Sequence, residues 1–480
     1  MPKRLLITIF LLISILLKGQ EKALNLLLTD SSMISSSISI CIRNTVNGET
    51  VFEFHPGESL IPASVLKLVT SSAALELLGP EYCFRTKIGY TGNLNKRTGR
   101  LTGDIIIKGG GDPALGSEYF KDHYRNFLKN WITEIGKLGI HKIEGRIIVD
   151  DSWYDYQPVP AKWLWEDIGN YYGAGAYGLS IFDNKFEIHL KTSGNGTLPE
   201  ITGIVPDQCR HELSNQLIAS DNTDKDGYVF STPYNDYGWL AGSIPVDRED
   251  FVLKASITDP PLLIAEIFDS MLDSAGIAVS GGPSTTRIEK KLGSDEPVIF
   301  AEVISPPLRD IIEVLNHESV NLFAEHVLKE IGKIYNNKGT TEAGIEVLYR
   351  FLKNSGVNSA GMFLEDGSGM SPMDALTSRG LTEILLFMKN KAKYFSDFYN
   401  SLPDAGKEGT LKNYFKNPVF DSNLKAKSGS MTRVRSYAGY FKTMSGNEMA
   451  FSILVNNYSG PSQRIVAGIE EILLQTILYR

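Results

Sequence analysis

The sequence predicts an α/β protein in which one domain is assembled from both ends of the chain and is interrupted by a β-rich insertion. Strand patterns lie near both ends, helical periodicity lies between them, and the middle consists of short β-rich runs with many glycines. At 480 residues the chain exceeds the roughly 250–300 residues that one hydrophobic core supports. We therefore expect residues 24–85 and 278–480 to form one domain and residues 86–277 to form the insertion.

The N-terminus predicts export. Residues 1–4 carry two positive charges, and the apolar run that follows, 5–17, is too short to cross a bilayer of ~30 Å as a helix. We interpret residues 1–20 as a signal peptide cut near Gly19 or Gln20, which predicts an exported protein of the periplasm or cell envelope. An uncleaved N-terminal anchor is the alternative. Nothing later in the chain resembles a membrane span, so none is expected in the mature chain.

The composition favours neither nucleic acid nor metal as a ligand. The formal net charge is −8, which lacks the basic footprint of a nucleic-acid-binding protein. The seven histidines are scattered and form no metal-ligand motif, so we expect no metal and no cofactor. Cys41, Cys83 and Cys209 leave two possibilities open, which are one disulfide with a spare thiol or three buried thiols.

The first predicted elements are a hairpin and a buried helix. Residues 37–43 and 50–54 alternate as strands, and Asn47-Gly48 between them predicts a type I′ turn. Pro62 precedes a segment with apolar residues at helical spacing, and Gly79 is a suitable C-terminal cap. This arrangement places Ser64 in the first turn of a buried helix.

Ser64-Val-Leu-Lys67 provides a nucleophile and a base. Positions i and i+3 of a helix lie on one face, so the Lys67 amine can reach the Ser64 hydroxyl. Burial and a second cation nearby should lower the pKa of Lys67 and allow its neutral amine to accept the serine proton. Alone, this spacing occurs by chance in many proteins.

The insertion contains two units that echo one another, 101–107 and 143–149. Each is an apolar strand entered through glycine and followed by a polar turn. Helical periodicity returns afterwards, and the chain closes with two apolar strands and an amphipathic helix. The expected ranges are 263–275, 321–331, 341–354 and 382–391 for the helices, 436–441 and 450–455 for the strands, and 462–478 for the last helix.

Two further motifs complete a candidate site. In Ser319-Val-Asn321, a turn before a helix lets Ser319 pass a proton to a leaving amine while the Asn321 amide holds the substrate. In Lys427-Ser-Gly429, Lys427 supplies positive potential, the Ser428 hydroxyl can bind a carboxylate, and Gly429 allows close backbone approach. The N–H groups of Ser64 and Ser430 are the natural oxyanion hole.

These three motifs, in this order, resemble those of the penicillin-binding D-alanyl-D-alanine carboxypeptidases and endopeptidases of the low-molecular-mass class C type. In that family a long insertion separates the first two motifs, and here 255 positions separate Ser64 from Ser319 against 108 from Ser319 to Lys427. Further strings look like the same family: Gly109-Gly-Gly-Asp-Pro113, Asp150-Asp-Ser-Trp-Tyr-Asp155, 165–172, Asp366-Gly-Ser-Gly369, 406–411 and Val455-Asn-Asn-Tyr458. Ser428 replaces the more usual threonine of the third motif and keeps the hydroxyl.

The resemblance implies a serine transpeptidase/β-lactamase-like domain, in which an antiparallel sheet is covered by helices, with two extra β-rich domains in the insertion. It implies as substrates peptidoglycan peptides that end in D-Ala-D-Ala, cleaved through an acyl-Ser64 intermediate, and as inhibitors β-lactam antibiotics. In relatives an insertion aspartate recognises the amine of the diamino acid. Asp151 is the candidate, followed by Asp150 and Asp155, and a solvated turn aspartate is the alternative.

Two other functions are compatible with part of the sequence. A serine β-lactamase is disfavoured by the long insertion, and the Glu166-Asp-Ile-Gly-Asn170 spacing that imitates its deacylating glutamate lies before Ser319 and is interpreted as a coincidence. A catalytically silent wall-binding scaffold is disfavoured because every nucleophile and base position is filled. Labelling by a penicillin separates the enzyme from the scaffold, and rapid penicillin turnover would indicate the β-lactamase.

Overall fold

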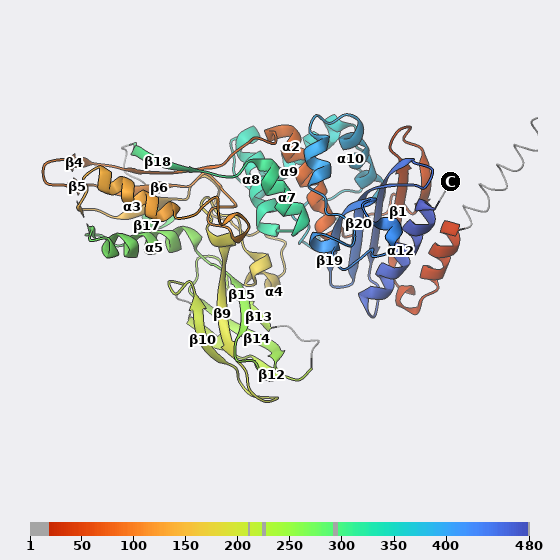
Figure 1. Ribbon diagram of the computed structural model, residues 1–480, viewed down its shortest axis with the longest axis horizontal. Coiled ribbons are helices and arrows are strands. Elements are labelled where there is room, and N and C mark those ends of the chain that lie inside the picture. The colour runs from red at the N-terminus through yellow and green to blue at the C-terminus, as the bar shows by residue number, and fades with distance from the viewer. Residues whose placement is uncertain (1–18, 210–211, 223–226, 291–295, 479–480) are drawn as a thin grey trace, which may run out of the picture. The chain divides into compact units, whose positions relative to one another are not determined.

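A computed structural model describes residues 19–209, 212–222, 227–290 and 296–478 (Figure 1). The chain divides into two compact units. Unit 1 contains the residues up to Pro80, Ile312–Val320 and those from Ile345 onward. Unit 2 contains Glu81–Ile311 and Asn321–Gly344. The predicted signal peptide falls almost entirely outside the described residues.

Unit 1 is built on a five-stranded antiparallel sheet that joins the two ends of the chain. The strand order is β19-β20-β21-β1-β2, and β1 from the N-terminal part pairs along its whole length with β21 from the C-terminal part. This pairing confirms the α/β fold class with an antiparallel sheet. The strands are β1 (Ser37–Asn44), β2 (Thr50–Phe54), β19 (Leu424–Met431), β20 (Val434–Lys442) and β21 (Glu448–Asn456).

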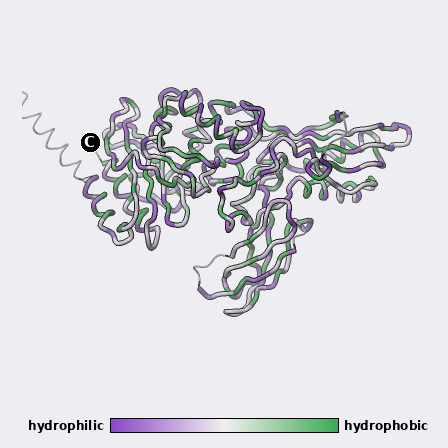
Figure 2. The backbone as a smooth tube through the Cα atoms, turned by 180° about the vertical axis from the view of Figure 1, so that it is seen from behind, coloured by the Kyte–Doolittle hydropathy of each residue, from purple (hydrophilic) through white to green (hydrophobic). Residues whose placement is uncertain are grey.

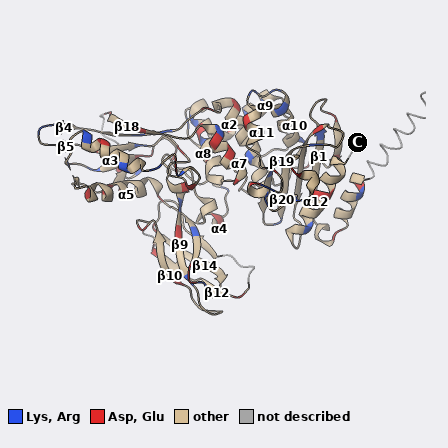
Figure 3. Ribbon diagram, viewed as in Figure 1, with Lys and Arg blue, Asp and Glu red and all other residues tan. Residues whose placement is uncertain are grey.

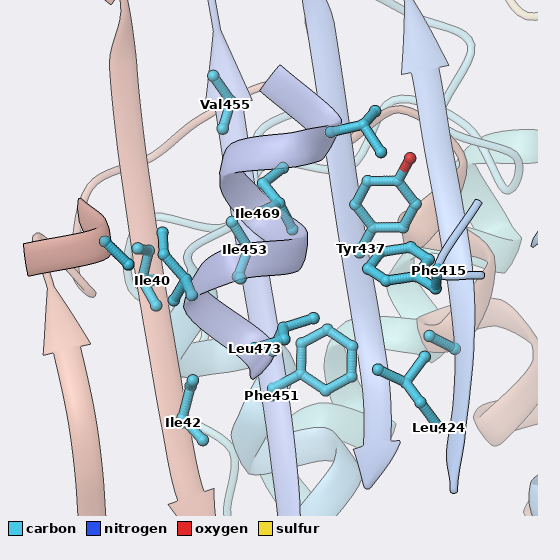
Figure 4. Packing of buried hydrophobic residues seen from close by; sticks show 14 of the residues in the cluster. Ile40, Ile42, Phe415, Leu424, Tyr437, Phe451, Ile453, Val455, Ile469 and Leu473 are labelled. Atoms are coloured by element: carbon cyan, nitrogen blue, oxygen red, sulfur yellow. The ribbon is translucent and has the colours of Figure 1, made fainter. Parts of the chain in front are cut away.

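Helices cover both faces of this sheet. On one face, helix α12 (Ser462–Ile477) and the helical residues 19–28 enclose a hydrophobic core with the strands. Figure 4 shows Ile469 and Leu473, one helical turn apart on α12, directed at Phe451 and Ile453 of β21. On the other face lies helix α10 (Ser378–Asn390), and the Tyr440 hydroxyl of β20 donates to the Leu385 carbonyl of this helix at 2.7 Å.

The Ser64 segment begins as a tighter turn than expected. Residues Ala63–Leu66 form a 3₁₀ turn (η2), and the α-helix proper, α2, runs from Lys67 to Leu78. Its residues are buried on all sides through Leu75, so the helix crosses the interior of the unit. Gly79 ends it with φ of 86°, as the C-cap prediction required. The remaining helices wholly within unit 1 are α10 and α11 (Phe395–Asn400).

The first hairpin is confirmed, but its predicted type I′ turn is wrong. Of the two central residues only Gly48 has positive φ, and its N–H donates to the Asn44 carbonyl. The Asn44 side chain accepts from the Val46 N–H at 2.8 Å. Because this side-chain turn begins at Asn44, the loop holds four residues instead of two.

Unit 2 confirms the β-rich insertion, and the two echoing units lie side by side in it. Each splits at its glycine into two strands, and the copies pair in parallel at a constant offset: Leu101 opposite Ile143, and Ile105 opposite Ile147. The Arg146 N–H donates to the Asp104 side chain where both copies bend. The strands are β3 (Arg85–Tyr90), β4 (Asn93–Asn95), β5 (Arg100–Thr102), β6 (Ile105–Lys108), β7 (Lys142–Ile143) and β8 (Ile147–Asp150), with helices α3 (Phe127–Lys137) and α5 (Pro260–Ser274).

A separate group of strands forms the second part of unit 2. Its two sheets have the orders β10-β9-β15 and β11-β14-β12, and β13 pairs with β14. They enclose their own core around Ile188, Val229 and Leu240. The strands are β9 (Lys185–Lys191), β10 (Glu200–Val205), β11 (Glu212–Asn215), β12 (Ile218–Ser220), β13 (Gly227–Phe230), β14 (Tyr237–Pro245) and β15 (Phe251–Ser256), preceded by the short helix α4 (Trp165–Ile168).

The return of the chain from the insertion differs from the boundary expected at residue 278. Strands β16 (Ala278–Val279), β17 (Ser284–Thr285) and β18 (Val298–Ile304) pair with β7, β8 and β3, which completes the sheets of unit 2. Helix α8 (Asn321–Asn336) also belongs to unit 2. Between them run α6 (Thr286–Glu289) and α7 (Leu308–His317), and α9 (Thr341–Ser355) follows. These pairings join strands that are more than 100 residues apart in the sequence, so no local pattern indicates them.

Hydropathy and charge are distributed without long blocks. Figure 2 shows hydrophobic residues interspersed with hydrophilic ones along the described chain, and Figure 3 shows acidic and basic residues intermixed. Among the helices that the structure describes, none has the length and apolar character required to cross a bilayer.

Truncation of the core side chain at Phe451 should selectively destabilise unit 1. Phe451 is fully buried against α12, so Phe451→Ala should cost about 3–5 kcal/mol through lost burial and the cavity that remains. Differential scanning calorimetry should show a lower melting temperature for one transition. Val46→Ala, at an exposed position of the same unit, should leave the transition unmoved, and an unchanged thermogram for Phe451→Ala would contradict this assignment of the core.

Candidate active site

The first motif places a buried lysine against the Ser64 hydroxyl. The Lys67 ammonium donates to Ser64 Oγ at 3.0 Å and to the Ser368 carbonyl at 2.8 Å. The Lys67 side chain has 0 % exposure. The residue before the serine, Ala63, has φ of 47°, which is unusual for a residue other than glycine. This strained turn holds Ser64 at the entrance of the buried helix.

The second and third motifs meet through another lysine. The Lys427 Nζ on β19 donates to Ser319 Oγ at 2.9 Å and to the Ser428 carbonyl at 2.9 Å. Lys427 is also 0 % exposed. Ser319 follows helix α7 and has φ of 60°. The backbone at this second hydroxyl of the site therefore adopts the left-handed conformation, which is uncommon for a residue other than glycine.

Strand β19 passes directly beside the Ser64 backbone. A Cβ atom added to Gly429 would lie 2.6 Å from the Pro62 carbonyl oxygen and 3.0 Å from the Ser64 nitrogen. Only glycine therefore fits at this point of the strand, as the sequence predicted. The close approach brings the third motif to the backbone N–H of Ser64. Ser430 follows on the same strand, and its predicted role in the oxyanion hole stays a prediction.

The Ser428 hydroxyl lies beside another hydroxyl that the sequence did not single out. Ser428 Oγ donates to Thr410 Oγ1 at 2.7 Å. Thr410 belongs to a 3₁₀ turn, η6 (Gly409–Leu411), within the string 406–411. The pair offers two polar groups for an anionic substrate group next to the buried Lys427 cation.

A turn that begins at Asp366 holds the backbone carbonyl that Lys67 contacts. The Asp366 carboxylate accepts the backbone N–H groups of Ser368, Gly369, Met370 and Ser371, at 2.6–3.0 Å. This fixes the Ser368 carbonyl, which accepts a hydrogen bond from Lys67 Nζ. Sequence reasoning noted the Asp366-Gly-Ser-Gly369 string but gave it no role, although an aspartate followed by small residues is a signal for such a turn.

The two buried lysines influence each other electrostatically. Burial, followed by the charge of Lys67, lowers the pKa of Lys427 well below its ordinary value, and the nearby Glu318 carboxylate opposes this only in part. Because repulsion between two ammonium groups acts equally on both, the pair favours a state with a single positive charge. A neutral amine near a serine hydroxyl is the condition for general-base activation of the nucleophile.

Asn321 is the first residue of α8 and lies in unit 2. Its side-chain amide donates to the Tyr172 carbonyl at 2.9 Å. The structure thus attaches this motif residue to the segment 170–172 of the insertion. Its role in holding the substrate stays a prediction.

Asp151 is placed differently from the exposed carboxylate that amine recognition requires. It is only 2 % exposed, and one oxygen accepts a short hydrogen bond from the Thr286 hydroxyl. Burial raises its pKa. Asp155, the neighbouring candidate, forms an ion pair with the buried Lys329 at 2.7 Å. Asp155 and one oxygen of Asp151 thus have protein partners, whereas the buried Oδ2 of Asp151 has no hydrogen-bond partner among the described residues.

The Glu166…Asn170 spacing also has a structural explanation. The Asn170 side chain donates to the Glu166 carbonyl at 2.7 Å and accepts from the Val229 N–H at 3.1 Å. Asn170 therefore ties α4 to β13, which agrees with the interpretation of the spacing as a coincidence.

Cys41, Cys83 and Cys209 are free thiols, which rules out the disulfide; Cys41 and Cys209 are buried as expected, but Cys83 is partly exposed. Within the described residues, no group of three or more His, Cys, Asp or Glu side chains is arranged to hold a metal ion.

Comparisons with known proteins find relatives that match most of the chain. The curated D-alanyl-D-alanine carboxypeptidase of Actinomadura sp. (strain R39) is 28% identical over 448 residues, covering 91% of this chain and 80% of the relative. The D-alanyl-D-alanine carboxypeptidase DacB of Haemophilus influenzae is 23% identical over 439 residues, covering 90% and 88%. The crystal structure of penicillin binding protein 4 from Haemophilus influenzae superimposes with a TM-score of 0.80 at 22% identity, covering 93% of this chain and 97% of that one, and shows the same fold.

The family model described as the D-Ala-D-Ala carboxypeptidase 3 (S13) family matches residues 20–473. This range spans both units and all three motifs. The chain therefore belongs to the D-Ala-D-Ala carboxypeptidase 3 (S13) family.

Proposed function

We propose that this chain is a serine D-alanyl-D-alanine carboxypeptidase, with DD-endopeptidase activity, that acts on peptidoglycan peptides through an acyl-Ser64 intermediate. The observation that carries the proposal is the contact of 3.0 Å between the buried Lys67 amine and Ser64 Oγ, close to a second buried lysine. The names of the curated relatives support this choice of reaction.

Acylation begins when the neutral Lys67 amine takes the Ser64 proton and Ser64 Oγ attacks the carbonyl carbon of the penultimate D-alanine. The developing oxyanion is held by the backbone N–H groups of Ser64 and Ser430. Lys67 now carries a positive charge, and this charge lowers the pKa of Lys427 further. Lys427 then releases its proton through the Ser319 hydroxyl to the leaving amine, and the C–N bond breaks.

Deacylation reverses these proton movements. Water attacks the acyl-Ser64 carbonyl and gives its proton to Ser319, which passes one to Lys427. The ester C–O bond breaks, and Lys67 returns its proton to Ser64 Oγ. The lysine pair ends with the single positive charge with which it began, so each turnover hydrolyses one bond without a net change in the site.

Substrate recognition is assigned to the third motif. The terminal carboxylate of a D-Ala-D-Ala peptide carries one negative charge, which Lys427 complements and the Ser428 and Thr410 hydroxyls can bind. A β-lactam antibiotic carries a comparable carboxylate next to a reactive carbonyl, so we expect it to acylate Ser64. A wall substrate places the mature protein in the periplasm or cell envelope, with residues 1–20 removed on export.

Ser64→Ala and Lys67→Ala should both abolish labelling by a fluorescent penicillin. The first variant lacks the nucleophile and the second lacks the base, so each should lower the acylation rate by about 10³-fold or more. Intact-protein mass spectrometry checks whether the adduct forms. Lys412→Ala, which removes an exposed lysine of the same unit, should label normally. Acylation of Lys67→Ala at the wild-type rate would refute lysine as the base.

The rate of acylation should increase with pH, and the apparent pKa of this increase should lie well below the ~10.4 of an ordinary lysine. Below that pKa both amines are protonated and no base is present, whereas above it one amine is neutral. In Lys427→Ala the rising limb should move to higher pH, because Lys67 no longer faces a second ammonium. The second-order rate constant for penicillin, measured from about pH 5 to about pH 10, tests this. A limb that stays in place would contradict the coupling.

Digestion of purified muropeptides should release one terminal D-alanine and open cross-linked dimers. Both reactions cleave a bond after the same penultimate D-alanine, so one acyl-enzyme serves both. Mass spectrometry distinguishes the products, and Ser64→Ala is the control. Intact muropeptides together with rapid hydrolysis of penicillin would point to a β-lactamase instead.

A further inference from the structure

Unit 2 contains a cleft of about 590 Å³ that the proposed catalytic chemistry does not use. Aromatic side chains from four separate elements line it: Tyr119, Tyr171, Tyr172, Tyr228 and Phe251. Tyr171 is 51% exposed. Large, partly exposed rings gathered around a hollow are typical of a ligand site.

The charged groups of the cleft neutralise one another. Lys185 forms ion pairs with Glu118 and Asp183, and Lys254 pairs with Glu187 at 3.6 Å. The cleft therefore presents apolar ring faces and hydroxyl groups, and these two lysines and three carboxylates are all held in ion pairs. A matching ligand is uncharged, has flat apolar faces and bears many hydrogen-bonding groups, and pyranose rings have these properties.

The aromatic lining continues beyond the cleft. Tyr228 and Phe230 lie two apart on β13 and so share one face of the strand. Phe230 stacks on Trp239 of β14, with ring centroids 5.1 Å apart and an interplanar angle of 8°. Trp165 is the next ring of the row: its ring centroid lies 5.9 Å from that of Trp239, and the residue is 47% exposed. A row of rings that extends past one cavity suits an extended chain of sugar units better than a single small molecule.

We propose that the cleft and its aromatic row bind a glycan chain of β-1,4-linked N-acetylated hexosamines. The choice of sugar rests on the proposed function, because the peptides of the bacterial wall are carried by such a chain. The rings stack on the apolar faces of the sugars, and the tyrosine hydroxyls and the ion pairs meet their hydroxyl and acetamido groups. The insertion thus holds the polymer while the catalytic unit acts on its peptides.

The test is binding of the uncharged tetramer of N-acetylglucosamine to the full chain, followed by isothermal titration calorimetry. We expect saturable binding that Tyr228→Ala weakens about tenfold or more, which corresponds to the loss of one stacking ring. Trp165→Ala should weaken the tetramer more than the dimer, because only the longer ligand reaches the end of the row. Tyr335→Ala is the matched control, since Tyr335 is a tyrosine of unit 2, 46% exposed on α8 and outside both the cleft lining and the row, and should bind as the wild type does.

Penicillin labelling of the same samples keeps the two proposals separate. Tyr228→Ala should be acylated as fast as the wild type, since no ring of the row takes part in the proposed chemistry. If Tyr228→Ala fails to fold, Trp165→Ala decides the outcome. Absence of saturable binding up to about 10 mM tetramer, or equal binding by the ring variants, would overturn the glycan site. Absence of labelling in a wild-type protein that binds the tetramer would overturn the proposed function alone.

Discussion

The burial of two lysines inside one hydrophobic unit is the constraint on which the site depends. Moving an isolated ammonium group out of water costs several kcal/mol of free energy, unless hydrogen bonds and nearby opposite charge compensate for the lost hydration. Lys67 and Lys427 receive such compensation from carbonyl and hydroxyl oxygens. The compensation is incomplete because the two charges repel each other, and this residual cost favours the loss of one proton from the pair. The same burial lowers the pKa of Lys427 well below its ordinary value and so favours a neutral amine in the site.

The backbone around the lysines is correspondingly strained. Ala63 and Ser319 both have positive φ, at a cost of order 1–3 kcal/mol each, and each flanks or carries a hydroxyl of the site. Gly369 approaches the Ala63 carbonyl, and Gly429 approaches the Ser64 nitrogen, so closely that a Cβ atom would clash at either position. The four N–H groups held by Asp366 keep one of these approaches in place. Strain concentrated in this way pre-organises the hydroxyls before any substrate arrives.

A feature of the fold or the site could be predicted from the sequence when the residues that determine it lie close together in the chain. The pairing of Ser64 with Lys67 was predictable because helical spacing is a local property. The glycine at 429 was predictable only through its motif, because the Pro62 carbonyl that excludes a Cβ atom belongs to a distant part of the sequence. The echo of 101–107 in 143–149 also predicted two similar strands, and the structure pairs them in register. The Asn47-Gly48 turn was misjudged because the Asn44 side chain competes for the same backbone groups. The burial of Asp151 depends on Thr286, which is 135 residues away and invisible to any local pattern.

The position of α8 shows why the insertion is more than an addition to the catalytic unit. Glu330 on this helix accepts hydrogen bonds from Trp153 Nε1 at 2.9 Å and from the Tyr154 hydroxyl at 2.8 Å, and Lys329 pairs with Asp155. A buried carboxylate and a buried ammonium with this many partners fix a helix in one orientation, since a rotation would leave both unsatisfied. Asn321 begins this helix, so the amide of the second motif is held by residues of the insertion. A substitution in the 153–155 segment would therefore change the position of Asn321 without a change in Ser64, Lys67 or Lys427.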